Sequence, residues 1–136
     1  MQYSQAPLCS IRVPISIGEL IDKISILEIK AERIVEGSKL RNVEVELALL
    51  KEIKSAARLD QPDMESFAEE LKSINTELWD IENEIRELEA QQDFGERFVM
   101  LARKVYLTND RRARLKHKIS QVYGSDIIEE KSYSGG

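Results

Sequence analysis

The sequence has few of the residues that build turns, disulfides and aromatic clusters. Its 136 residues include one Cys, three Pro, six Gly and only 6% aromatic side chains. The lone Cys9 cannot form an intramolecular disulfide, and nothing near Met1 resembles a signal peptide, so an intracellular, cytoplasmic protein is expected. Apolar runs are far shorter than the roughly 20 residues that cross a bilayer, so no membrane partner is expected.

Motifs that indicate catalysis or the binding of a cofactor are also missing. There is no glycine-rich phosphate loop, no cluster of metal ligands and no nucleophile motif, so neither a cofactor nor a metal is predicted. The pairs Glu19/Asp22 and Glu77/Asp80 have the spacing of the Mg²⁺ carboxylates in all-α nucleotide pyrophosphohydrolases. Helical phasing, however, directs Asp22 and Asp80 outward, and Glu19 is expected to cap a helix, so a metal site is the less favoured interpretation.

What the sequence does contain is helical periodicity. With 42% hydrophobic and 33% charged residues, the composition suits one all-α domain over residues 1–136, with an irregular lead over 1–15 and a tail over 125–136. The clearest pattern lies in residues 64–92, where apolar residues recur every three or four positions. These residues are Phe67, Leu71, Ile74, Leu78, Ile81, Ile85 and Leu88.

Local signals divide the chain into four helices. The first is expected to begin at Ser16 with a capping box to Glu19 and to end at Gly37. The second spans about 40–59. The third is capped by Asp63 and ends near residue 92.

The fourth helix is expected to begin with a capping box from Asp93 to Glu96 and to end at Gly124. Short connections predict two antiparallel hairpins with coiled-coil-like packing. The third and fourth helices are the longest, and parts of their apolar seams lack a partner within the chain. A homodimer through these two helices is therefore predicted.

Charge is unevenly distributed along the chain. Residues 60–96 contain thirteen Asp and Glu against Lys72 and Arg86, whereas residues 97–118 contain eight Lys and Arg against Asp110. Two interpretations remain open: antiparallel helices that attract along their flanks, or an anion site on the basic helix. Nucleic acid is an unlikely partner, because the basic stretch lacks interleaved aromatics and the net charge is −5.

The fourth helix contains the best functional candidate. Its apolar seam is interrupted by Thr108 and Arg112, and an arginine in a packing seam is costly unless it is paired or wet. Arg112 either pairs with Glu77 or Glu84 to set register, or helps to hold a phosphate or carboxylate. Trp79 either widens the core or a dimer interface, or stacks on a ligand. The candidate ligand-binding residues are Tyr106, Asn109, Asp110, Arg112, Lys116, Arg103, Trp79 and Glu82.

Several phrases together resemble a small family of bacterial and phage proteins known only as a domain of unknown function. They are residues 17–24 (IGELIDKI), 26–30 (ILEIK), 74–82 (INTELWDIE), 105–116 (VYLTNDRRARLK) and 129–133 (EEKSY). The resemblance implies an all-helical protein of bacterial or phage origin, with some relatives near cell-surface polysaccharide genes, and it implies no activity. Its polar positions are Asp22, Lys23, Glu28, Lys30, Asn75, Trp79, Glu82, Arg86, Tyr106, Asn109, Asp110, Lys116, Glu130, Lys131 and Tyr133.

The leading hypothesis is a non-catalytic binding or scaffolding module with a protein partner or a small anionic ligand. The rival is a small all-helical enzyme or ligand-binding protein with an anion site on the fourth helix, linked to nucleotide-sugar or surface-polysaccharide metabolism. The chorismate-mutase class shows that helical dimers catalyse with charged groups aimed at a dianion. By that analogy the acting residues are Arg112, Lys116, Arg103 and Glu82.

Overall fold

The computed structural model describes residues 11–132, and within them the chain is all-helical, with no strand. The helices are α1 (Ile17–Arg33), α2 (Gly37–Ala56), α3 (Pro62–Ala90) and α4 (Glu96–Val122). The prediction of an all-α chain is confirmed. No described helix is both long enough and apolar enough to span a bilayer.

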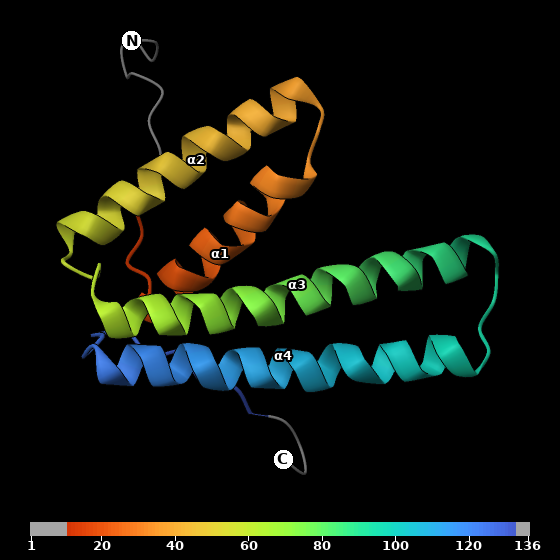
Figure 1. The fold of residues 1–136 in the computed structure, drawn as a ribbon. Helices are drawn as coiled ribbons and strands as arrows, with labels where there is room; N and C mark the ends of the chain where they lie inside the picture. The colour runs from red at the N-terminus through yellow and green to blue at the C-terminus, as the bar shows by residue number, and fades with distance from the viewer. Residues whose placement is uncertain (1–10, 133–136) are drawn as a thin grey trace, which may run out of the picture.

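The helices form two hairpins, α1 with α2 and α3 with α4 (Figure 1). Helix α1 packs on α3 and α4, whereas α2 packs on α1 and contacts neither α3 nor α4 through its backbone. Figure 1 shows α1 near the start of α3 and the end of α4, away from the loop that joins these two helices. The loop end of the α3–α4 hairpin therefore extends past α1.

The core lies where α1 crosses the α3–α4 hairpin. It is built from periodic apolar positions of α1, α3 and α4, as the seam of α3 predicted, together with Leu59 from the α2–α3 connection. Its buried members are Leu20, Ile21, Ile24, Leu59, Met64, Leu71, Ile74, Leu78, Leu115 and Ile119. Tyr123 packs against this core, and burial, with the neighbouring Asp63 carboxylate as a further cause, raises the pKa of Tyr123 to about 12.

The start of α1 is confirmed only in part. The Ser16 hydroxyl accepts a hydrogen bond from the Glu19 N–H at 3.0 Å, which is one half of the predicted capping box. The Glu19 carboxylate turns away from the cap and pairs instead with Lys116 on α4. A long-range ion pair therefore replaces the second half of the box.

Two predicted boundary residues, Gly37 and Asp63, were wrong. Gly37 begins α2 and does not end α1, because the Glu36 carboxylate caps α2 by accepting from the N–H groups of Ser38 and Lys39. A hydrogen bond from the Ser38 hydroxyl, together with these two backbone bonds, lowers the pKa of Glu36. Helix α3 begins at Pro62 with Gln61 as its N-cap, so Asp63 lies in the first turn.

The start of α4 also differs. Its N-cap is Gly95, whose N–H donates to the Asp93 carboxylate at 3.1 Å, so the predicted Asp93–Glu96 box does not form. The end of α4 agrees with the prediction. Gly124 follows the helix with φ of 66°, the left-handed conformation that glycine adopts at low cost.

Residues 125–132 are fastened to the start of α1. The Ile17 N–H donates to the Ser125 hydroxyl at 3.1 Å, and the Ser16 hydroxyl donates to the Glu129 carboxylate at 2.8 Å. Lys131 pairs with Asp110 of α4 at 3.1 Å. The C-terminal segment thus bridges α1 and α4. Tyr133, which the resemblance singled out, lies outside the described residues.

Candidate ligand-binding groove

A polar groove of about 450 Å³ opens beside the core where α1, α3 and α4 meet. We name it the α1–α3–α4 groove. Because α1 covers only part of the α3–α4 hairpin, its edge forms one wall of the groove. The lining residues are Ile26 and Ile29 from α1; Asn75, Leu78, Trp79, Glu82, Asn83 and Arg86 from α3; and Asn109 and Arg112 from α4.

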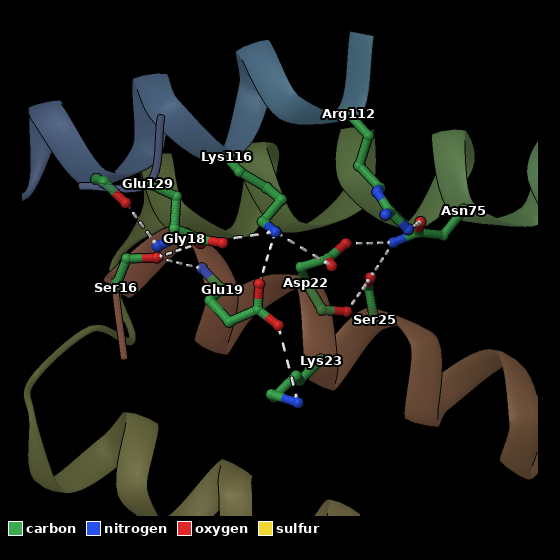
Figure 2. Close-up of polar contacts among 11 residues, drawn as sticks. Ser16, Gly18, Glu19, Asp22, Lys23, Ser25, Asn75, Arg112, Lys116 and Glu129 are labelled. Carbon is green, nitrogen blue, oxygen red and sulfur yellow. Dashed lines mark hydrogen bonds and ion pairs between the residues drawn. The ribbon is translucent and has the colours of Figure 1, made fainter. Parts of the chain in front are cut away.

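Arg112 is held in the groove by an amide. Its guanidinium donates to the Asn75 side-chain oxygen at 3.3 Å, and this is its sole hydrogen bond among the described residues. Asn75 is itself buried, and its amide nitrogen donates to the Asp22 carboxylate at 2.8 Å and to the Ser25 hydroxyl at 2.7 Å. Figure 2 shows Arg112 and Lys116 reaching from α4 toward α1, with Asn75 of α3 close to Arg112.

Lys116 lies one turn from Arg112 and faces a cluster of carboxylates. Its ammonium group is 2.6 Å from Glu19, 3.8 Å from Asp22 and 3.6 Å from Glu129 (Figure 2). The prediction that Asp22 points outward was wrong, since its exposed fraction is 3%. The helical phasing of α1 placed its apolar seam correctly. Because α3 and α4 both pack against α1, however, they bury side chains beside the seam as well, and Asp22 is one of them.

The structure separates the predicted site residues into two groups. Trp79, Glu82, Asn109 and Arg112 line the α1–α3–α4 groove. The other four do not line it: Tyr106 and Arg103 are exposed, Asp110 pairs with Lys131, and Lys116 faces the carboxylate cluster.

The predicted partners of Arg112 were also wrong. Glu77 pairs with Arg111 at 3.1 Å, and Glu84 pairs with Arg97, which lowers the pKa of Glu84 through its hydrogen bonds. The charge complementarity between α3 and α4 is therefore satisfied by flanking arginines. Arg112 is left facing an uncharged amide.

Several groove residues were not among the site residues predicted from the sequence. Asn75 follows Ile74 of the apolar seam, so its position next to buried residues was a usable signal for a buried polar group. Arg86 lies four residues after Glu82 on α3, a spacing typical of a surface ion pair, but it forms no ion pair among the described residues. No sequence pattern indicated a site role for Asn83, Ile26 or Ile29. They line the groove only because α1 crosses the α3–α4 hairpin next to them.

The described residues contain no group of three or more His, Cys, Asp or Glu side chains that could hold a metal ion. The carboxylates of the spacing comparison have other partners. Asp80 pairs with Arg33 of α1, Glu77 with Arg111, and Glu19 with Lys116.

The fold and the groove together define a class: a small all-helical protein with a polar groove beside the crossing of three helices. Residues 11–136 match DUF6165, a family of unknown function, and the chain belongs to that family. The resemblance to a family of unknown function is thereby confirmed. No curated protein and no solved structure matches the chain.

Proposed function

We propose that this protein is a non-catalytic binding module that holds a small anionic ligand in the α1–α3–α4 groove. The observation that carries the proposal is the environment of Arg112. Its half-buried guanidinium lines the groove and contacts an amide oxygen, with no carboxylate in ion-pair distance among the described residues. Hydrogen bonds to a charged group contribute about 1.5–3 kcal/mol, so a phosphate or carboxylate gains from this site.

The remaining polar residues of the groove favour an anion as well. Arg86 adds a second guanidinium without an ion pair among the described residues, against the single carboxylate of Glu82. The side-chain amides of Asn83 and Asn109 form no hydrogen bond within residues 11–132, so both are available to orient a ligand. The groove therefore presents a net positive charge together with neutral donors.

The lining favours binding over covalent chemistry. Trp79 is half-buried at the groove and offers an aromatic face to the body of a ligand. None of the described residues that line the groove is a Ser, Thr, Cys, Lys or His. The rival enzyme hypothesis required Lys116 and Arg103 to converge with Arg112, and neither lines the groove.

A thermal-shift screen with matched variants tests the proposal. The panel consists of sulfate, nucleotides, nucleotide sugars, phosphorylated sugars and dicarboxylates. At least one compound should raise the Tm of the native protein, because binding to the folded state alone stabilises it. Arg112→Leu should remove the rise, whereas Arg114→Leu should keep it, because Arg114 is exposed on α4 outside the groove.

Two results would contradict the proposal. One is a panel in which no compound shifts the Tm of the native protein. The other is an equal loss of the shift in both variants, which would mean that net charge and not the groove is responsible.

The bacterial or phage origin and the link to surface-polysaccharide metabolism stay predictions from the family resemblance.

We also propose that the protein forms a homodimer through the outer face of α4. Four exposed apolar residues lie on this face with a spacing of seven: Val99 with Tyr106, and Met100 with Leu107. Arg103 and Asp110 share the face, also seven residues apart. An antiparallel second copy would bring each Arg103 opposite Asp110 of the partner subunit, and this complementarity favours a copy of the same chain.

A further inference from the structure

The orientation of the Asn75 amide is fixed by its neighbours. Its nitrogen contacts two acceptors, the Asp22 carboxylate at 2.8 Å and the Ser25 hydroxyl at 2.7 Å. The Ser25 hydroxyl donates its only hydrogen to the Asp22 backbone carbonyl oxygen at 2.8 Å, so it can only accept a hydrogen bond from Asn75. A flipped amide would set its oxygen against a carboxylate and its hydrogens against a guanidinium.

This orientation separates two charged systems. On one side of Asn75, Asp22 lies within ion-pair distance of Lys116, which also holds Glu19. On the other side, the Arg112 guanidinium donates a hydrogen bond to the Asn75 amide oxygen, and this amide carries no net charge. An aspartate at position 75 would neutralise Arg112, whereas the asparagine holds the guanidinium in place and leaves its full charge to the groove.

We infer that Asn75, locked by Asp22 and Ser25, is a positioning residue that orients Arg112 toward the groove without neutralising it, and so gives the groove its preference for anions. Asp22 acts through Asn75 and does not contact the ligand. This inference rests on the proposed anion-binding function and names the residue that positions the arginine of the same site.

A reversal of the two groups tests the inference. The double variant Asp22→Asn/Asn75→Asp keeps one amide and one carboxylate in the buried pair, but it moves the negative charge next to Arg112. Lys116 keeps Glu19 as its partner, so the fold is expected to persist and is checked by thermal melting. Sulfate is the probe, because it is a dianion at pH 7.

At pH 7 the reversed variant should bind sulfate at least about tenfold more weakly than the native protein, because a carboxylate now competes for the guanidinium. Equal affinity of the two proteins at pH 7 would overturn the inference.

A second measurement does not depend on a ligand. NMR relaxation of the Arg112 Nε–H group reports the order of the side chain. Asn75→Ala should make this group mobile, since the guanidinium loses the one hydrogen bond, from Nη1, that anchors it. Asn83→Ala should leave it ordered, because Asn83 lines the groove without a hydrogen bond to Arg112. If Arg112 is equally ordered in both variants, Asn75 does not position it. Failure of the native protein to bind sulfate, in contrast, would count against the anion site and not against the positioning.

Discussion

At the scale of single residues, the absence of one Cβ atom allows α1 to reach α4. A Cβ on Gly18 would lie 2.2 Å from the Lys116 carbonyl oxygen, a contact that neither backbone can relieve without moving apart. The Gly18 N–H also donates to the Ser120 hydroxyl at 2.9 Å, so the approach is fixed by a hydrogen bond as well as by shape. This contact places Lys116 over Glu19 and Asp22, and through Asp22 it supports Asn75.

Gly18→Ala should therefore destabilise the protein by about 1–3 kcal/mol, the usual cost of overpacking a closed interface. Gly37→Ala is the matched control. A Cβ there would meet nothing closer than the Arg41 guanidinium at 3.6 Å, so Gly37→Ala should not lower the stability. Urea unfolding of the two variants measures both effects. Equal stability of the two would show that α1 and α4 are not held together at Gly18.

The position of a residue could be predicted from the sequence where that residue breaks a pattern. Arg112 interrupts an apolar seam, so its position near the core could be read from spacing, and Trp79, Glu82 and Asn109 join it in the groove. The partner of Arg112 could not be read in the same way. Which of Asn75, Glu77 and Glu84 meets it depends on the register between α3 and α4, and flanking arginines take both carboxylates.

At the scale of elements, α3 contributes a large share of the buried core residues. Its seam predicted the buried residues Leu71, Ile74, Leu78 and Ile81, because a long run of spacings of three and four is hard to satisfy by chance. Helix ends were predicted less well. Glu36 and Gly95 act as caps although serine, threonine, aspartate or asparagine is the usual residue, and a local sequence pattern does not indicate such a choice.

Ile81→Asp tests the assignment of α3 as the core element. Ile81 is 6% exposed, and a carboxylate there loses its hydration with no cation in the surrounding apolar seam. We expect a loss of at least about 3 kcal/mol, enough to unfold much of the protein at 37 °C. Val45→Asp on α2 should stay within about 0.5 kcal/mol of the native protein, because Val45 is 71% exposed. Circular dichroism during thermal melting distinguishes the two, and an unchanged Tm for Ile81→Asp would refute the assignment.

At the scale of the whole molecule, the two hairpins differ in what they leave uncovered. The crossing of α1 shields one part of the α3–α4 hairpin and leaves its loop end uncovered (Figure 1). The α1–α3–α4 groove also stays open. The sequence indicated this imbalance through helix lengths, since the third and fourth helices were predicted to outrun the first two. It did not indicate the crossing itself, which depends on the close approach at Gly18 and on the ion pairs of Glu32 and Arg33 with Lys72 and Asp80.

The exposed face of α4 leads to a prediction about the mass of the protein in solution. If a second copy covers Val99, Met100, Tyr106 and Leu107, light scattering should give twice the 15.6 kDa of the chain. Leu107→Glu should reduce the mass to that of one chain, because it buries a carboxylate against apolar side chains of the partner. Val45→Glu on α2 should leave the mass unchanged.

A charge reversal tests the antiparallel arrangement. Arg103→Asp should weaken the dimer by placing like charges opposite each other, and Arg103→Asp combined with Asp110→Arg should restore it, since each reversed pair again attracts. Asp110→Arg also breaks the ion pair that Asp110 forms with Lys131 within the chain, so Asp110→Arg alone is measured as the control for that loss. A native protein with the mass of one chain, or a double variant that dimerises no better than Arg103→Asp, would contradict this arrangement. The outer face of α4 would then be left for a different partner, and the groove on the other side of the hairpin would remain open to its ligand in the monomer.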